Sequence, residues 1–139
     1  MEINKLVNAL DNNSNESIMK FTTKKIVEMN LNILKQLHLS KEDTLNYLNK
    51  LKGYRYVDEI NDLHYGSYLR WIPITDPNNL HLNYAGILCD IKITNSGIMI
   101  VCKNFMHRHY TFKMDECLIF QKLSEQELVI LAALDHLEK

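Results

Sequence analysis

The sequence predicts an α+β fold in which an N-terminal helix pair leads into a five-stranded antiparallel small barrel, followed by a buried C-terminal helix. Three patterns predict it. Apolar residues recur with a helical period over residues 22–52, the strand period of two dominates residues 67–122, and residues 125–138 are apolar around most of a helix. We expect a helical segment, 1–53, and a barrel with its helix, 54–139, packed as one compact unit.

Two amphipathic helices are expected in segment 1–53. The first spans residues 22–38, and the following "SKED" is a capping box in which Ser40 and Asp43 satisfy the first amides of a second helix over 41–52. The asparagine-rich run "DNNSNES" that precedes both helices is typical of a loop. The apolar positions on one face of the first helix are Ile26, Val27, Ile33, Leu34 and Leu37.

Five short strands are expected in the second segment. "SYLRWIPIT" (67–75) is rich in aromatic and β-branched residues, and "GILCDIKIT" (86–94) joins "IMIVCK" (98–103) through the hairpin turn "NSG". Two further strands follow at 107–114 and 117–122. Closure into a barrel is favoured because it removes exposed strand edges. Alternation along the second strand places Ile87, Cys89, Ile91 and Ile93 on one face.

The last helix begins at a second capping box, "SEQE", in which Ser124 is the N-cap and Glu127 its partner. Residues 125–138 present apolar side chains in nearly every direction, so this helix is expected to be buried on more than one side. It packs either between the sheet and the N-terminal helices or in a subunit interface. The second arrangement predicts a homodimer.

Composition excludes several classes of protein. The chain has 139 residues, a net charge of -1 and no apolar run long enough for a membrane span. We expect an intracellular protein without a signal peptide and with reduced thiols, because three cysteines fit neither a disulfide framework nor a zinc pair. No nucleophile elbow, phosphate loop or metalloprotease motif occurs, and Cys89 and Cys117 are expected to be buried, so no enzymatic activity and no cofactor is predicted.

Residues 91–114 contain basic side chains and no acid, which is the electrostatic pattern of a nucleic-acid-binding hairpin. In that hypothesis a ring at the turn stacks on a base. The alternative is an ordinary solvated strand face, since the density of positive charge is near normal. The candidate nucleic-acid-binding residues are Lys92, Lys103, Phe105, Arg108 and Lys113.

Two other sites are candidates. His107 and His109 are two positions apart on an expected strand, a spacing that zinc sites use, and Cys102 is the nearest third ligand although its alternation points it to the core. The alternative is two solvated histidines. A second candidate is an aromatic cage for a methylated lysine or arginine, formed by Tyr68, Trp71 and Tyr84 with Phe105 opposite; the alternative is that Trp71 fills the core.

The pieces "GSYLRWI" and "IFQKLSEQE", within residues 54–134, resemble small uncharacterised proteins of large DNA viruses of the Marseillevirus kind. The resemblance implies a viral protein of the host cytoplasm or the virion and brings no catalytic residues. The strand order is similar to SH3-like and Tudor-like barrels, which mostly bind other molecules. The leading hypothesis is therefore a non-enzymatic, self-associating protein-interaction module, with nucleic-acid binding and a metalloprotein as alternatives.

Overall fold

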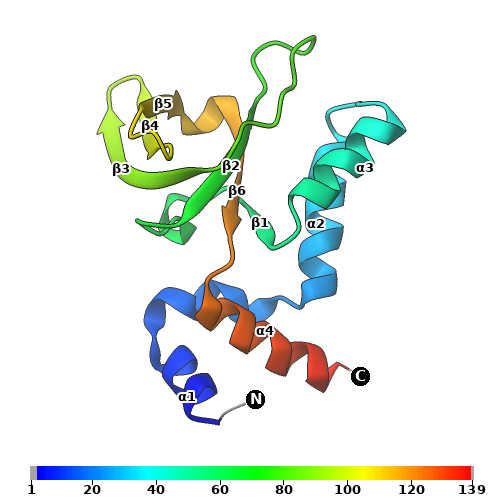
Figure 1. Ribbon diagram of the computed structural model, residues 1–139, viewed down its shortest axis with the longest axis vertical. Helices are drawn as coiled ribbons and strands as arrows, with labels where there is room; N and C mark the ends of the chain where they lie inside the picture. The colour runs from blue at the N-terminus through cyan, green and yellow to red at the C-terminus, as the bar shows by residue number, and fades with distance from the viewer. Residues whose placement is uncertain (1–2, 139) are drawn as a thin grey trace.

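The computed structural model describes residues 3–138 of the chain and has the predicted α+β composition (Figure 1). Its helices are α1 (Ile3–Asp11), the 3₁₀ helix η1 (Asn13–Lys20), α2 (Thr23–Lys35), α3 (Lys41–Lys50) and α4 (Glu125–Leu137), with short 3₁₀ turns η2 (Ile60–Asp62) and η3 (Met114–Glu116). Its strands are β1 (Tyr54–Val57), β2 (Tyr68–Pro73), β3 (Gly86–Thr94), β4 (Gly97–Lys103), β5 (His109–Lys113) and β6 (Cys117–Lys122).

The sheet has six antiparallel strands in the order β1-β6-β2-β3-β4-β5, so the prediction of five strands in a closed barrel is wrong. The missed strand is β1, whose four residues follow Gly53 directly and are too few to show a period. The barrel stays open because η3 turns the chain after β5 and sends β6 between β1 and β2, which leaves β1 and β5 as edges.

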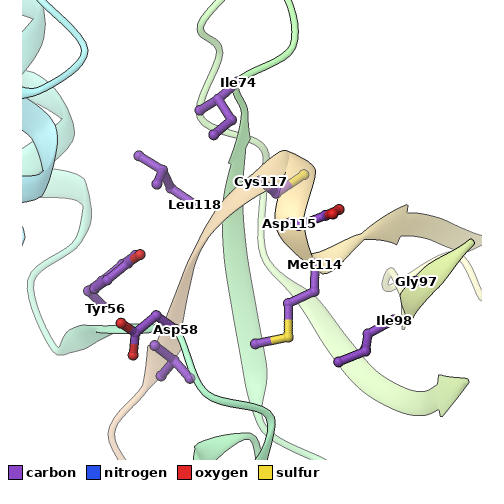
Figure 2. A pocket seen from close by; sticks show the side chains of 10 residues that line it. Tyr56, Asp58, Ile74, Gly97, Ile98, Met114, Asp115, Cys117 and Leu118 are labelled. Atoms are coloured by element: carbon purple, nitrogen blue, oxygen red, sulfur yellow. The ribbon is translucent and has the colours of Figure 1, made fainter. Parts of the chain in front are cut away.

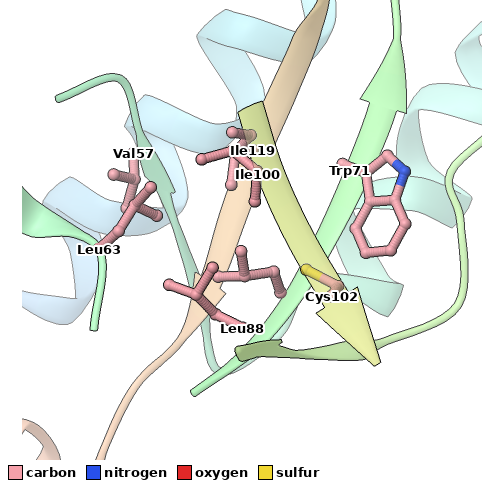
Figure 3. Close-up of a cluster of buried hydrophobic side chains, with 8 residues drawn as sticks. Val57, Leu63, Trp71, Leu88, Ile100, Cys102 and Ile119 are labelled. Carbon is pink, nitrogen blue, oxygen red and sulfur yellow. The ribbon is translucent and has the colours of Figure 1, made fainter. Parts of the chain in front are cut away.

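The main core lies on the inner side of this bent sheet (Figure 3). The Trp71 ring of β2 stacks on the Phe112 ring of β5 with centroids 4.6 Å apart, so side chains from strands that do not pair in the sheet meet across the core. Burial of these apolar groups holds the sheet in its bent shape. The buried members are Val57, Leu63, Leu69, Trp71, Leu88, Ile100, Cys102 and Ile119.

A β-bulge corrects the predicted face of β3. The pairing with β4 runs from Leu88 opposite Cys102 directly to Asp90 opposite Val101, so Cys89 is the extra residue. The bulge exchanges the two faces, and Leu88 rather than Ile87 or Cys89 points into the core. Period-two reasoning fails here because one unpaired residue reverses every side chain before it.

Helices α2 and α3 cover the outer side of the sheet, close to their predicted positions, and α2 begins at a Thr22 cap. Gly53, at φ +82, follows α3 and leads into β1. The buried side chains between the two helices and the sheet are Leu34, Leu51, Ile72, Leu82 and Phe120.

Helix α4 packs on α1, η1 and α2 rather than on the sheet (Figure 1). Ile130 and Leu131 are buried against Ala9 and Ile18, but Leu128 is 50% exposed and Leu137 is 78% exposed. Within the single chain, α4 therefore does not pack between the sheet and the N-terminal helices, and the alternative of a subunit interface stays a prediction. The capping box of Ser124 and Glu127 is confirmed. None of the helices within residues 3–138 has the length and apolar character needed to cross a membrane.

The run "DNNSNES" is not a loop but forms most of η1. The Asn12 side chain accepts a hydrogen bond from the Ser14 amide at the start of η1. Asn15 is buried and donates to the Ala9 carbonyl at 2.9 Å and to Gln126 Oε1 at 3.0 Å. These asparagines therefore connect the first and last helices, since Gln126 belongs to α4.

A buried ion pair joins β1 to α4. Arg55 Nε lies 4.0 Å from Glu127 Oε2, and both side chains are almost fully buried. Arg55 also donates to Ser17 Oγ at 2.9 Å and lies over the Phe21 ring. Within the described residues, Arg55 Nε and Glu127 Oε2 have no hydrogen-bond partner, so the pair is held by charge and by burial.

Candidate functional site: an aromatic groove beside an edge strand

A groove of about 430 Å³ lies between β2, the segment before β3 and the hairpin that joins β4 to β5. Five rings line it together with Pro73, two asparagines and the backbone around Gly86. No charged side chain contributes to this lining. We call it the aromatic groove, and its rings are Trp71, Tyr84, Phe105, Tyr110 and Phe112.

Trp71 forms the floor of the aromatic groove. Its ring is only 6% exposed, stacks on Phe112 and lies 6.5 Å from the Tyr110 ring. Gly86 allows this arrangement, since a Cβ there would lie 3.1 Å from Cys102 Cβ and 3.3 Å from the indole. The indole Nε1–H donates to no acceptor within residues 3–138 and is not fully buried, so this donor remains free for a ligand.

Tyr84 and Phe105 form the walls and are among the most exposed rings of the molecule, at 86% and 90%. Asn104 holds the turn that carries Phe105: its Oδ1 accepts from the amides of Met106 at 2.9 Å and Arg108 at 3.0 Å, and its Nδ2 donates to the Tyr110 hydroxyl at 3.3 Å. The exposed Phe105 ring on this hydrogen-bonded turn is therefore prepared for contact with a ligand.

The structure brings together part of the predicted aromatic cage. Trp71 and Tyr84 share the groove, and Phe105 lies in it as expected. Tyr68 does not, because it precedes Leu69 and points to the opposite side of β2, where Lys122 lies 5.5 Å from its ring. Tyr110, which was not among the predicted site residues, also faces the groove and is 45% exposed. Tyr110 lies only two residues after the turn at 104–108, and this closeness in the sequence is the signal that could have assigned it to the same site as Phe105.

The predicted basic residues do not form one uninterrupted surface. Lys92 and Lys113 flank Met99 across β3, β4 and β5, and Lys103 lies opposite His109 at the other end of the same face. Lys113 pairs with Glu116 at 3.9 Å. Asp90 lies on this face as well, opposite Val101. The acid-free stretch of sequence is therefore bordered by acids in space. Arg108 lies in the turn beside Phe105.

His107 and His109 are not two positions of one strand. His107 has a φ of 62 and closes the turn through a hydrogen bond from its amide to the Asn104 carbonyl, and β5 begins only at His109. The predicted zinc site assumed that both histidines lie on one face of a single strand, and this arrangement does not occur. Over residues 3–138, no group of three His, Cys, Asp or Glu side chains is placed to hold a metal ion.

The three cysteines have different surroundings. Cys102 is buried in the core, as its alternation predicted, and burial raises the pKa of its thiol to about 12. Burial and the nearby Glu116 raise the pKa of Cys117 to about 11. Cys89 is exposed at the bulge, so its predicted burial is wrong. The raised pKa values make Cys102 and Cys117 poor nucleophiles.

Comparison with family models finds no match, and the searches of curated proteins and of solved structures find no similar protein.

Proposed function

We propose that this chain is a non-enzymatic protein-interaction module whose aromatic groove binds an extended, proline-containing segment of a partner protein. The observation that carries the proposal is the convergence of five rings on one uncharged groove, with two of them almost fully exposed. Exposed aromatic clusters of this kind are typical of binding surfaces, because a ring buries a large area for little loss of conformational entropy.

Proline fits this groove for two reasons. A polyproline II segment has no internal hydrogen bonds, so its carbonyls accept from the receptor, and its rings pack between aromatic side chains. The free indole N–H of Trp71 is a suitable donor for such a carbonyl, and Tyr84 and Phe105 supply the flanking rings. The segment is already extended before it binds, which reduces the entropy lost on binding.

The proposal also includes the origin of the protein, its location and its self-association. A viral protein that acts in the host cytoplasm or in the virion, with an SH3-like or Tudor-like relationship of its strands, is consistent with a binding module. Self-association as a homodimer is supported by the exposed apolar side chains Leu128 and Leu137 of α4. Light scattering over a range of protein concentrations tests it, and a monomer at every concentration contradicts it.

Nucleic-acid binding is the second candidate, because Phe105 lies beside Arg108 in a turn next to Lys103, and aromatic rings stack on bases. Lys92, Lys103 and Arg108 form no ion pair within the described residues. Three free cations give few phosphate contacts, so this candidate predicts weak binding that decreases steeply with salt.

Trp71 provides the test, since it is the only tryptophan of the chain and forms the floor of the groove. Its fluorescence is titrated with synthetic proline-rich peptides that lack aromatic residues. We expect a saturable spectral shift that Phe105→Ala and Tyr84→Ala abolish and that Tyr65→Ala leaves unchanged, because Tyr65 is an exposed ring outside the groove lining. No shift with any peptide contradicts the proposal.

Charge-reversal variants distinguish nucleic-acid binding from peptide binding. Anisotropy of labelled single-stranded oligonucleotides is measured at increasing salt, with Lys103→Glu and Arg108→Glu as the charge reversals. Binding of oligonucleotides that is lost in these two variants, together with no response to peptides, replaces the peptide ligand by nucleic acid. Peptide binding to an uncharged groove is instead nearly independent of salt.

A further inference from the structure

The outer edge of β5 carries backbone groups that form no hydrogen bond within residues 3–138. The hairpin fixes which groups these are. The Asn104 amide donates to the Arg108 carbonyl at 3.0 Å, and in an antiparallel pair the residues that bond to the neighbouring strand alternate from that point. Every second residue of β5 therefore directs its N–H and C=O groups away from β4. These residues are His109, Thr111 and Lys113.

A contact on the other side of β4 agrees with this assignment. Val101 lies opposite Thr111, so its carbonyl is expected to point toward β3 and away from β5. The Cys89 thiol of β3 donates to that carbonyl at 3.4 Å. Thr111 is exposed and lies at the centre of the free edge, with its amide and carbonyl directed outward.

The aromatic groove reaches this free edge. The Tyr110 and Phe112 rings lie on the face of β5 that packs on Trp71, and the alternation of a strand puts the Thr111 side chain on the opposite face. Thr111 nevertheless lines the groove together with both rings. A groove lined by three consecutive residues of one strand extends to the edge of that strand. A ligand in the groove therefore also meets the outward N–H and C=O groups of Thr111.

The free edge is short, because β5 has only five residues. After Lys113 the chain turns into η3, and Met114 lines a separate hollow of about 490 Å³ together with Ile98 (Figure 2). Before His109 the chain forms the turn that carries Phe105. The edge therefore accommodates one short extended segment.

We propose that an extended segment of a partner protein adds antiparallel to β5 as a further strand of the sheet. Its main chain exchanges hydrogen bonds with Thr111, its prolines lie in the aromatic groove, and an acidic side chain lies beside His109. The inference rests on the proposed function, since the segment is the same proline-containing ligand. It adds the main-chain pairing, the direction and the charge of that ligand.

Proline and strand pairing are compatible because of the antiparallel alternation. Segment residues opposite Tyr110 and Phe112 place their side chains in the groove and direct their N–H groups away from β5. Proline at these two positions removes no hydrogen bond of the pairing. The residue between them faces Thr111 and needs its N–H. The segment is therefore Pro-x-Pro, and a parallel strand is excluded because its groove-facing residues donate to the edge.

Charge selects the acidic residue and its position. His109 lies opposite Lys103 and follows Arg108, and neither of these two cations forms an ion pair within the described residues. At the other end of the edge, Lys113 already pairs with Glu116 at 3.9 Å. An acidic side chain is therefore favoured at the His109 end, which is the carboxyl-terminal end of an antiparallel segment.

The same charges disfavour a second copy of the chain at this edge. A two-fold pairing of β5 with itself about Thr111 sets His109 of each copy opposite Lys113 of the other. The basic ends of the two strands then lie side by side, which is destabilising. An acidic segment of a different protein meets no such repulsion.

The experiment uses a blocked pentapeptide, serine-proline-valine-proline-glutamate, and the full-length protein. Binding is followed by Trp71 fluorescence and by hydrogen exchange of the Thr111 amide, which slows when that amide is hydrogen-bonded. In a matched peptide an ester oxygen replaces the valine N–H and leaves every side chain unchanged. We expect the parent peptide to protect Thr111 and the ester to bind about tenfold more weakly, because one main-chain hydrogen bond is lost. Equal affinity of the two peptides overturns the strand pairing.

Two further comparisons test the protein side and the direction. Thr111→Pro removes the outward amide at an edge position that tolerates proline, and we expect it to weaken binding, whereas Thr111→Ala keeps the amide and the affinity. The isomeric peptide glutamate-proline-valine-proline-serine moves the charge to the Lys113 end and is expected to bind about threefold more weakly. Tighter binding of this isomer overturns the assigned direction.

The two readouts distinguish this inference from the proposed function. A Trp71 response without protection of Thr111 overturns the added strand and leaves peptide binding in the groove. Protection of Thr111 without a Trp71 response contradicts the groove and leaves the added strand. A Thr111 amide that is protected in the free protein and exposed on dilution shows that a second copy occupies the edge, which overturns the proposal.

Discussion

The two edge strands of the sheet, β1 and β5, differ in whether the rest of the chain forms hydrogen bonds to their free backbone edges. Along β1, the buried Asn30 of α2 accepts from the Tyr56 amide and donates to the Tyr54 carbonyl, each at 2.9 Å, so one side chain replaces the missing neighbour strand. Along β5, no helix, loop or side chain of the described chain forms a hydrogen bond to the backbone of residues 109–113, apart from the pairing with β4.

The difference shows where the molecule is closed and where it is available to a ligand. An uncovered edge promotes aggregation unless charge or shape protects it. Here β1 is covered by a helix and is also held by the buried pair of Arg55 and Glu127. In contrast, β5 supplies Tyr110 and Phe112 to the aromatic groove and ends in the charged residue Lys113. The uncovered edge and the proposed binding surface are the same element.

The largest effect is expected for Glu127→Gln, which removes the ion pair between α4 and the covered edge strand β1. Glutamine keeps the capping box but removes the charge opposite Arg55, which then remains buried and unpaired. We expect the free energy of unfolding to decrease by about 3–5 kcal/mol, measured by urea denaturation. Glu125→Gln, exposed in the first turn of the same helix, is expected to change it by less than about 0.5 kcal/mol. A small effect of Glu127→Gln means that the pair does not hold the edge.

The next test removes the amide that covers β1. Asn30→Ala leaves the Tyr56 amide and the Tyr54 carbonyl without their partner, and we expect a loss of about 2–3 kcal/mol in the free energy of unfolding. Asn32→Ala is the control, because Asn32 is exposed on the same helix. Equal values for the two variants show that the edge is satisfied by water.

Thiol labelling measures whether the open edge stays folded without a ligand. Cys102 pairs with Tyr110 of β5 and has a pKa raised to about 12, whereas Cys89 is exposed. At pH 8 we expect a thiol reagent to modify Cys89 and to leave Cys102 unmodified until the protein is unfolded. Below a thiol's pKa the thiolate fraction grows tenfold per pH unit, so labelling of Cys102 accelerates as pH rises. Rapid labelling of Cys102 at pH 8 indicates that β5 opens.

The smallest expected effect is on stability at the open edge. Phe105→Ala and Tyr84→Ala remove two highly exposed rings, so each changes the free energy of unfolding by less than about 0.5 kcal/mol while peptide binding is lost. Gly86→Ala is a useful contrast, because its new Cβ crowds Cys102 and the Trp71 ring and is expected to alter the groove from below. A large loss of stability in Phe105→Ala means that the ring has a structural role.

Local signals predicted most of the helices and strands, but not α1, η1 or β1. Capping at Ser40 and Ser124, helical periods in α2 and α3, and strand composition in β2, β3, β4 and β6 were all readable in the sequence. The strand β1 was missed because only four residues support it, and the bulge at Cys89 was missed because a single inserted residue leaves alternation almost intact on either side.

The candidate site was predicted only in part. Trp71, Tyr84 and Phe105 were named together because aromatic residues stand out in a sequence. Tyr68 was included because it lies close to Trp71 in the sequence, although the two side chains lie on opposite sides of β2.

The packing of α4 against α1 and η1 affects how the chain acquires its structure during synthesis. The hydrogen bonds from Asn12 and Asn15 to Gln126 span 114 and 111 positions of sequence. The first helix leaves the ribosome long before its partner exists, so the apolar side chains Leu6, Ala9 and Ile18 stay uncovered until the last helix emerges. This apolar surface therefore stays accessible to chaperones until α4 has emerged from the ribosome.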